Sequence, residues 1–499
     1  MISFNEKNQK VHLIGISGAE GSSVASFLLK QGYTNLVGHD HVPESEFRAS
    51  FFRFHDWMTE QQKELSFQKL KDSGITFHFE DTYLADIGEE DIIFVPQSWF
   101  RYGFNEPLRK FFGEDLKVRP EFQDRIWSMT KLYLTLFPGR VVGVTGSNGK
   151  STTTAMIAAM LKAHLESTKA GKLYWGGNDR KNPQPLDEIE SATASDLLLL
   201  EMSNRQLSLG LGKSPNVAVI TNVVPNHLDD HGTFEAYVAV KEEIVRYQVE
   251  SDTAVLNWNN IPSREAKNVM VGNIVFFDLN PDTKPVPEGF VGTRKEGVEL
   301  VSYETDGKRS VIASTEDVTI PGEHNVENAL AAIAAMRSFG VHSEAIRSAL
   351  RGFGGLDHRL ELVAEKSGVK YVNDSSGCSP LNIVMAVNAL PGNLILIMGG
   401  YRKNPTPGEF LPVAEAAKDD RIKHLFLIGS IQETLEKELH EGGVEAEKIT
   451  RCANLEEAFA KARAMAQSGD TVALTPGCES FGEFRDYRER GERFRRLSS

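Results

Sequence analysis

The stretch Gly143-Val-Thr-Gly-Ser-Asn-Gly-Lys-Ser-Thr152 constrains the fold of this chain more than any other segment. Its glycines allow backbone N–H groups to turn toward phosphate oxygens, and a following helix would add the positive end of its dipole. Residues 140–144 predict a short apolar strand and residues 152–165 a helix, which is the context that such a loop requires. We therefore predict a triphosphate site, with Lys150 on the outer phosphates and Ser151 on Mg²⁺, made of Gly146, Asn148, Gly149, Lys150, Ser151 and Thr152.

Length and composition restrict the class of protein. A chain of 499 residues is too long for one core, so several domains are expected. The net charge of −14 argues against a general nucleic-acid or anionic-membrane surface. No apolar run reaches the roughly 20 residues that span a bilayer, and the N-terminal residues lack the apolar core of a signal sequence. The three cysteines form no disulfide or metal-ligand pattern, so we expect a cytoplasmic protein without membrane insertion.

Residues 1–139 predict a first α/β domain. A strand at 11–16, a glycine-rich turn with Gly18, a helix to residue 32 and a second strand ending at Asp40 resemble the start of a dinucleotide-binding fold. Gly18 and Asp40 are candidate substrate residues, although the turn could be purely structural and Glu20 within it counts against diphosphate contact. Further strands are expected at 75–79 and 91–96, followed by an amphipathic helix at 122–137.

Residues 140–352 predict a second, parallel α/β domain around the phosphate loop. Apolar strands at 196–203 and 216–222 place Glu201 at one strand end and His227 beyond the other, where ligands bind in such sheets. A solvated carboxylate and a packing histidine are the alternatives. Lys241, on a helix at 234–247, is indicated by sequence alone as a solvated helix residue. Asn325 and Asn328 lie one helical turn apart and could bind a purine or phosphate, unless Asn325 caps the helix.

Residues 353–499 predict a third domain with a second doubly wound sheet. Strands are expected at 369–373, 394–398, 424–428, 449–452 and 471–475, with a helix at 455–467. Their ends carry Asp374, the segment 399–403 and the segment 476–480, a polar rim with cations that could receive a carboxylate. Residues 485–496 are dense in charge and predict a solvated terminal helix. The fold class is thus α/β with three domains: N-terminal Rossmann-like, central P-loop ATPase-type parallel sheet, and C-terminal Rossmann-like.

Several motifs in order resemble the Mur ligases, most closely the glutamate-adding member. They are Gly-Ser-Asn-Gly-Lys-Ser151, Glu201-Met-Ser203, Asn222 to Asp229, Lys241, Gly322 to Asn325, Asp357-His-Arg359, Asn373-Asp-Ser375 and Pro476 to Ser480. The resemblance covers about residues 140–499 and is looser before them. Two departures stand out: Ser376-Gly-Cys378 replaces the family's Lys-Ala-Thr, and Val95-Pro-Gln-Ser98 replaces its Ser-Pro-Gly.

The resemblance implies an ATP-dependent ligase of peptidoglycan precursor synthesis that adds glutamate, with the D form favoured, to UDP-MurNAc-L-alanine through an acyl phosphate. It implies a monomer with ATP and two Mg²⁺ ions, and assigns catalysis to Lys150, Glu201, His227 and Lys241. One ion would be held by Ser151 and Glu201, and the other by His227 and a carbamate of Lys241. The resemblance also assigns ATP to Asn325, Asn328, His358, Arg359 and Asp374, the UDP-sugar to Asn178, and the amino acid to Lys403, Ser480 and Tyr487. Ser203, Gly18 and Asp40 are further candidate substrate-binding residues.

Two alternatives stay open at this point. The same chemistry could serve L-glutamate or another amino acid, because the lysine lost at residue 376 removes a cation from the pocket expected to bind a dicarboxylic acid. The chain could instead be a regulatory nucleotide-binding protein without ligase activity. The joint presence of Lys150, Glu201, His227 and Lys241 disfavours that second alternative.

Overall fold

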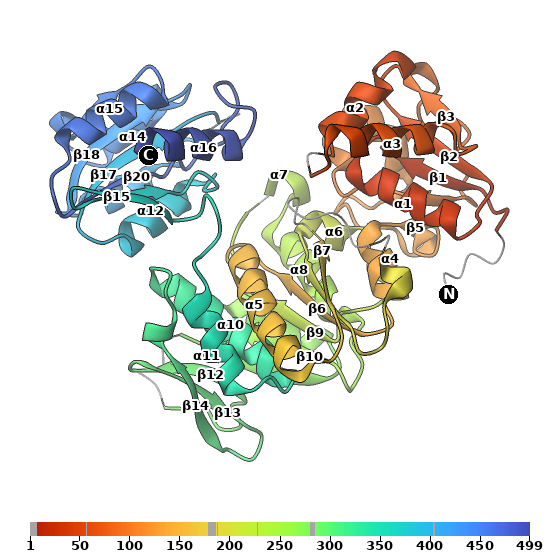
Figure 1. The fold of residues 1–499 in the computed structure, drawn as a ribbon, viewed down its shortest axis with the longest axis horizontal. Coiled ribbons are helices and arrows are strands. Elements are labelled where there is room, and N and C mark those ends of the chain that lie inside the picture. The colour runs from red at the N-terminus through yellow and green to blue at the C-terminus, as the bar shows by residue number, and fades with distance from the viewer. Residues whose placement is uncertain are drawn as a thin grey trace. The chain divides into compact units, whose positions relative to one another are not determined.

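The structure is a computed structural model that describes residues 7–55, 57–177, 186, 188–226, 228–279, 285–402 and 405–499, except the side chain of residue 229. The described residues form three sheets with helices between the strands (Figure 1). The chain divides into two compact units, one of Met1–Asp317 with Glu327–Arg351 and one of Val318–Val326 with Gly352–Ser499. The three-domain α/β fold class is confirmed, while the boundaries at residues 139 and 352 stay predictions.

The first sheet is parallel, with strand order β3-β2-β1-β4-β5. Its strands alternate with helices, as the dinucleotide-fold interpretation predicts (Figure 1). The strands are β1 (Val11–Ile14), β2 (Leu36–Asp40), β3 (Thr76–Phe79), β4 (Ile92–Phe94) and β5 (Ile126–Trp127), and the helices are α1 (Ala19–Lys30), α2 (Phe47–Arg53) and α3 (Glu60–Lys71).

The predicted helix at 122–137 is wrong in its first half. Pro120 opens a short 3₁₀ turn, and Ile126 and Trp127 then pair with β4 as the edge strand β5. The helix α4 (Met129–Leu136) starts only after Ser128, whose side chain accepts a hydrogen bond from the Lys131 N–H (3.1 Å). Sequence periodicity assigned the buried side chains of β5 to a helix, because a two-residue strand carries no period of its own.

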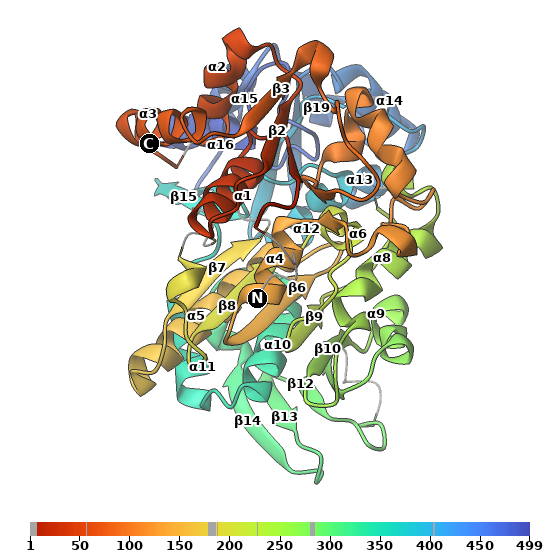
Figure 2. The same ribbon diagram turned by 90° about the vertical axis from the view of Figure 1, so that its right-hand side faces the viewer.

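The central sheet has the order β14-β13-β12-β11-β10-β9-β6-β8-β7. Figure 2 shows β7, β8, β6, β9 and β10 side by side. The seven neighbouring strands β7, β8, β6, β9, β10, β11 and β12 are parallel. The pairs β12–β13 and β13–β14 are antiparallel and extend the predicted parallel sheet at one edge. The strands are β6 (Arg140–Thr145), β7 (Leu173–Gly177), β8 (Leu197–Glu201), β9 (Val217–Ile220), β10 (Thr253–Asn257), β11 (Asn273–Asp278), β12 (Gly292–Glu296), β13 (Glu299–Tyr303) and β14 (Arg309–Ser314).

Helices connect these strands and place their polar residues at the strand ends. The longest, α5, begins at Lys150 directly after the phosphate loop, slightly earlier than predicted. The connecting helices are α5 (Lys150–Thr168), α6 (Asn204–Ser208), α7 (Leu228–His231), α8 (Phe234–Arg246), α9 (Ile261–Glu265), α10 (Glu323–Ser338) and α11 (Ser343–Gly352).

The third sheet has the order β15-β16-β20-β17-β18-β19, and every strand predicted for it is present. An additional antiparallel edge strand, β15 (Glu361–Lys366), was missed because its charged and half-exposed residues resemble a loop. The others are β16 (Val369–Asn373), β17 (Asn393–Gly399), β18 (Ile422–Ile428), β19 (Ile449–Arg451) and β20 (Asp470–Leu474), with helices α12 (Pro380–Ala389), α13 (Leu411–Ala416), α14 (Gln432–Glu441), α15 (Leu455–Met465) and α16 (Tyr487–Ser498).

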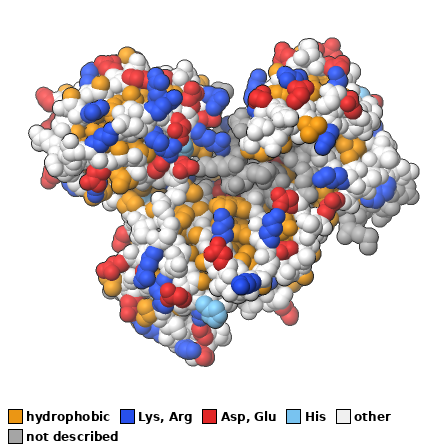
Figure 3. Space-filling view, in the orientation of Figure 1, with side chains coloured by type: hydrophobic (Ala, Val, Ile, Leu, Met, Phe, Trp, Pro, Cys, Tyr) orange, Lys and Arg blue, Asp and Glu red, His pale blue; other side chains and the backbone are white. Residues whose placement is uncertain are grey.

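The interpretation of residues 485–496 as a solvated helix is wrong for one face of α16. Arg490 and Phe494 on this helix are fully buried in the second unit. Elsewhere, side chains of both signs are interspersed over the face shown in Figure 3. Within the described part of the chain, every helix is too short or too polar to cross a membrane.

Candidate active site

The phosphate loop joins β6 to α5 at the carboxyl end of the central parallel strands. The Ser147 N–H donates to Asn222 O (2.7 Å) and the Asn148 N–H donates to Asn222 Oδ1 (3.0 Å). The Thr221 hydroxyl donates to Asn148 O (2.6 Å). Residues that follow β9 therefore hold the loop in place, and the predicted strand–loop–helix context is confirmed.

Two positions in the loop require glycine. Gly146 has φ +149°, and a Cβ there would lie 1.9 Å from Thr221 Oγ1. Gly149 has φ +80°, and a Cβ there would lie 2.2 Å from Asn328 Oδ1. Any other residue would strain the backbone and collide with a neighbouring side chain. Asn328, predicted as an ATP-site residue, thus packs directly on the loop and also accepts a hydrogen bond from the Thr153 hydroxyl (3.3 Å).

The two lysines predicted to be catalytic belong to one cluster. Lys150 Nζ donates to the loop carbonyls of Gly146 (2.9 Å) and Ser147 (3.0 Å). Lys241, from α8, is only 1% exposed, and its Nζ donates to Thr145 Oγ1 (3.2 Å). The solvated-lysine interpretation of Lys241 is therefore wrong. Burial holds the pKa of Lys241 well below its ordinary value, nearby Lys150 lowers it further, and the negative charge of Glu201 opposes both.

Glu201 is the last residue of β8 and pairs in parallel register with Val144 of β6. It is 7% exposed, so the alternative of a solvated strand-end carboxylate is also wrong. The electrostatic interaction of Glu201 with Lys241 places a carboxylate beside the loop that carries Lys150. Two lysines and a carboxylate therefore interact electrostatically at the phosphate loop.

The donor set suits a magnesium ion held jointly with phosphate oxygens. In the described ranges no group of three or more His, Cys, Asp and Glu side chains is arranged for a metal. Mg²⁺ needs no such cage, because it keeps waters and takes one or two carboxylates plus phosphate oxygens. Glu201 and Ser151, which lies in the first turn of α5, supply these ligand types. The predicted residues His227, Asn178 and Lys403 lie outside the described residues.

Asn325 does not cap the helix α10. It is the third residue of that helix, whereas an N-terminal cap precedes the first helical residue, and its Nδ2 donates to Pro321 O (2.6 Å). The capping alternative considered for Asn325 is therefore wrong. Its predicted role toward ATP is not affected by this result.

In the second unit, the predicted ATP residues His358, Arg359 and Asp374 lie close together. Asp374 is 5% exposed, and its Oδ1 accepts from the Leu360 N–H (3.2 Å). Burial raises the pKa of Asp374 to about 7, although the positive charge of Arg359 opposes the rise. The buried ring of His358 stands edge-on to that of Tyr487, with centroids 6.0 Å apart.

Arg490 is a site residue that the sequence interpretation missed. It is 1% exposed, and its guanidinium donates to Ser375 Oγ (3.0 Å), Ser375 O (2.9 Å), Cys478 O (3.0 Å) and Glu479 O (3.2 Å). The Ser375 hydroxyl in turn donates to Tyr487 O (2.7 Å). This arginine therefore joins the loop after β16 to the loop after β20. A buried arginine inside a charge-rich terminal segment gives no separate signal in the sequence.

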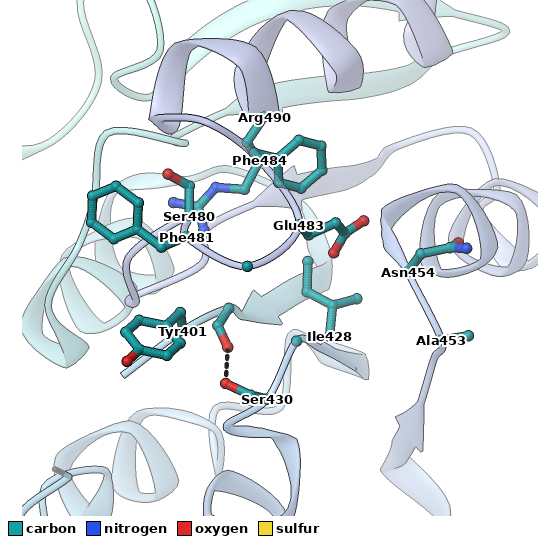
Figure 4. Close-up of a pocket in the computed structure, with 13 residues that line it drawn as sticks. Tyr401, Ile428, Ser430, Ala453, Asn454, Ser480, Phe481, Glu483, Phe484 and Arg490 are labelled. Atoms are coloured by element: carbon teal, nitrogen blue, oxygen red, sulfur yellow. Dashed lines mark hydrogen bonds between the residues drawn. The ribbon is translucent and has the colours of Figure 1, made fainter. Parts of the chain in front are cut away.

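Ser480 lines a pocket of about 370 Å³ at the carboxyl ends of β17, β18 and β19. Figure 4 shows the rings of Tyr401 and Phe481 on one side of the pocket and Asn454 on the other, with Ser430 below. Connections from the sheet leave toward different helices here, which is where ligands bind in open α/β sheets. The other predicted amino-acid residue described, Tyr487, starts the helix α16 nearby in sequence.

The candidate residues of the first sheet hold its glycine turn together. The Gly18 N–H donates to Gly15 O (2.9 Å), and Asp40 Oδ2 accepts from the Ser17 N–H (2.9 Å). Asp40 is buried, so its carboxylate braces the turn in this structure. Ser203 caps α6 at the end of β8, where its hydroxyl accepts from the Gln206 N–H (3.2 Å).

Sequence comparison decides the family of this chain. The model of the Mur ligase middle domain matches residues 144–336, and the model of the Mur ligase glutamate ligase domain matches residues 358–478. The chain is 33% identical over 496 residues to the UDP-N-acetylmuramoylalanine--D-glutamate ligase of Acetivibrio thermocellus, which covers 98% of this chain and 96% of the relative. The chain belongs to the Mur ligase family. As a Mur ligase, it is an ATP-dependent ligase of peptidoglycan synthesis, as the motifs predicted.

Further comparisons agree with this assignment. The enzyme of the same name from Alkaliphilus metalliredigens is 34% identical and covers 99% of this chain and 98% of the relative. Among solved structures, the Thermotoga maritima UDP-N-acetylmuramate-alanine ligase MurC is similar with a TM-score of 0.55 at 19% identity, covering 98% of both chains. The Thermotoga maritima MurF ligase, solved in complex with ADP, has a TM-score of 0.53 at 21% identity and covers 75% of this chain and 85% of that one. These structures support the Mur ligase fold.

Proposed function

We propose that this Mur ligase joins D-glutamate to UDP-N-acetylmuramoyl-L-alanine at the expense of ATP. The supporting observation is that relatives named for this reaction are 33% and 34% identical over nearly the whole chain. The clustering of Lys150, Glu201 and Lys241 around the phosphate loop supplies the groups that the chemistry needs. Function follows from this site rather than from the fold alone.

The reaction has two steps. The carboxylate of the UDP-linked substrate attacks the γ-phosphorus of ATP, so that an acyl phosphate forms and ADP leaves. The amine of the amino acid then attacks the acyl carbon, the phosphate leaves with the C–O bonding pair, and the amine proton is released to the phosphate or to water as the amide forms. Lys150, the loop N–H groups and the N-terminal end of α5 stabilise negative charge in both steps.

The burial of the Lys241 amine favours carbamate formation. A depressed pKa raises the fraction of Lys241 that is a neutral amine, and only the neutral amine can add CO₂ and release a proton. The resulting carbamate would carry oxygen ligands that suit Mg²⁺. We propose two magnesium sites, one with Ser151 and Glu201 and the other with His227 and the Lys241 carbamate. Bound magnesium would neutralise the phosphate oxygens.

The remaining substrates are assigned by part of the chain. We propose that residues 1–139 bind the UDP end with Gly18 and Asp40, joined by Asn178 and Ser203, and that residues 140–352 bind ATP. Residues 353–499 would bind the amino acid with Lys403, Ser480 and Tyr487. The ATP site would be completed by a set of polar residues from the later part of the chain, namely Asn325, Asn328, His358, Arg359 and Asp374. A monomeric enzyme acting in the cytoplasm, where ATP is available, completes the proposal.

The test is a coupled phosphate-release assay with UDP-N-acetylmuramoyl-L-alanine, ATP and a panel of D and L amino acids. D-glutamate should give the highest kcat/KM, and phosphate release should require all three substrates. L-glutamate or another amino acid as the better substrate would instead support the second candidate, which the replacement of Lys-Ala-Thr by Ser376-Gly-Cys378 leaves open. If no amino acid elicits turnover, the ligase assignment fails for this chain.

A separate experiment examines Lys241. The Lys241→Ala variant should lose nearly all turnover and recover part of it with a short carboxylate such as acetate, which could occupy the space of the carbamate. Incubation of the wild-type protein with ¹³CO₂ should give a carbamate ¹³C resonance that the variant lacks. Full activity in CO₂-free buffer would contradict the carbamate.

A further inference from the structure

A hydrogen-bonded chain joins the first sheet to the central sheet within one compact unit. It consists of Glu20 in the first turn of α1, Gln97 after β4, and Ser203 at the end of β8. Glu20 and Gln97 are two of the positions at which the sequence departs from what a diphosphate turn and the family pattern predict. In the structure the side chains of Glu20 and Gln97 are hydrogen-bonded to each other.

The chemistry of the donor and acceptor atoms defines the direction of each bond. Glu20 Oε1 accepts from Gln97 Nε2 (2.9 Å), and Glu20 Oε2 accepts from the Gln97 backbone N–H (3.2 Å). On the other side, the Ser203 hydroxyl donates to Gln97 Oε1 (3.0 Å). A carboxylate at the start of a helix is itself favourable, because it lies at the positive end of the helix dipole.

Glu20 fixes which end of the Gln97 amide faces Ser203. The carboxylate can accept hydrogen bonds but cannot donate them, so the amide nitrogen must point to Glu20. The amide oxygen then has to face Ser203. A reversed amide would place two oxygens against each other at the Glu20 side. The orientation is therefore set by chemistry and not only by packing.

Ser203 has one hydroxyl proton and two possible acceptors. Gln206 Oε1 lies 3.1 Å from the hydroxyl, but it already accepts the Ser203 N–H (2.9 Å) in the cap of α6. The hydroxyl also accepts from the Gln206 N–H (3.2 Å). Donation to Gln97 Oε1 thus leaves Gln206 Oε1 to the Ser203 N–H and links the cap to the first sheet.

We infer that Gln97 is a positioning residue for the muramoyl substrate. It holds Ser203, two residues beyond the predicted magnesium ligand Glu201, at a set place relative to the glycine turn of the first sheet. A substrate that has its UDP end on the first sheet and its carboxylate at the phosphate loop must reach across this junction. The inference rests on the proposed function, because that function supplies the substrate.

Four variants test the inference. Gln97→Ala should raise the KM for UDP-N-acetylmuramoyl-L-alanine about 5- to 10-fold, the equivalent of one lost hydrogen bond, and leave the KM for ATP unchanged. Gln97→Glu should raise it more, since a second carboxylate would face Glu20. The double variant Glu20→Gln with Gln97→Glu should recover toward wild type, because the bond is restored with donor and acceptor exchanged. Glu20→Gln alone is the second single variant that a double-mutant cycle requires.

Gln68→Ala is the matched control. Gln68 donates to Asp72 (2.8 Å) on the exposed side of α3, a bond of the same type outside the junction. It should change neither KM. A purely structural role of Gln97 would lower the unfolding midpoint and change all KM values together, without rescue by the exchanged pair.

Calorimetric binding of the UDP-linked substrate distinguishes a failure of the proposed function from a failure of the positioning role of Gln97. If the wild type binds this substrate but shows no turnover, the proposed function fails, and the affinity difference between wild type and Gln97→Ala still tests the junction. If the wild type turns over and Gln97→Ala keeps the wild-type KM and affinity, the positioning role is refuted. Absence of binding by the wild type overturns both.

Discussion

Substitution of Asp374 by Asn should change the pH dependence of stability in a defined direction. The carboxyl of Asp374 is 5% exposed, and burial raises its pKa from 3.8 to about 7. The folded protein therefore holds a proton there that the unfolded chain releases above pH 3.8. The contribution of Asp374 to the free energy of unfolding is therefore present at low pH and is lost as the pH rises toward 7.

The size of this effect follows from linkage. Each pH unit between the two pKa values corresponds to about 1.4 kcal/mol, until the folded group ionises as well. The wild type should therefore lose about 2 kcal/mol relative to Asp374→Asn between pH 5 and pH 7, with a plateau above. The uncharged amide retains an oxygen that can accept from the Leu360 N–H, as Oδ1 of Asp374 does now.

Urea denaturation at pH 5, 6, 7 and 8 measures the difference in unfolding free energy between wild type and Asp374→Asn. Contributions from groups shared by both proteins cancel in this difference. Asp420→Asn, an exposed aspartate of the same unit, is the control and should leave the profile unchanged. ATP-dependent phosphate release should fall in Asp374→Asn even where the protein is more stable, because we assign Asp374 to the ATP site. Parallel profiles for wild type and Asp374→Asn across this range would refute the reasoning.

Three other changes have definite expected outcomes. Gly149→Ala should reduce ATP affinity at least tenfold by calorimetry, since its Cβ would meet Asn328 Oδ1 at 2.2 Å, whereas Gly32→Ala has the same φ of +80° with no atom within 4 Å and should leave ATP affinity unchanged. Burial and a neighbouring histidine lower the pKa of His39 from 6.5 to about 3, so the contribution of His39 to stability should fall by about 2 kcal/mol from pH 7 to pH 5. A His39→Gln variant should remove this contribution, which the difference between the two proteins in urea denaturation measures. Arg490→Lys keeps the charge but loses the planar guanidinium that makes four hydrogen bonds. The unfolding free energy should therefore drop by about 2 kcal/mol or more, and the KM for the amino acid should rise. An unchanged urea unfolding midpoint would contradict the role of Arg490 in joining the two loops.

The sequence by itself determined the phosphate loop. The glycines at 146 and 149 and the residues after them act within one turn, so local order in the chain is enough to identify the strand, the loop and the helix. The strands of the third sheet were equally legible, because their buried residues form continuous apolar runs. Strands without such runs, β5 and β15, were missed.

Tertiary structure decided the state of the charged residues. Lys241 stands beside two glutamates in the sequence, yet packing against β6 buries it and depresses its pKa. Arg490 stands in a charged terminal segment, yet carbonyls from two distant loops surround its guanidinium. The role of Gln97 depends on its hydrogen bonds with Glu20 and Ser203, which lie 77 and 106 residues away in the sequence. Burial and electrostatic environment are set by groups far apart along the chain, and local sequence patterns contain no record of them.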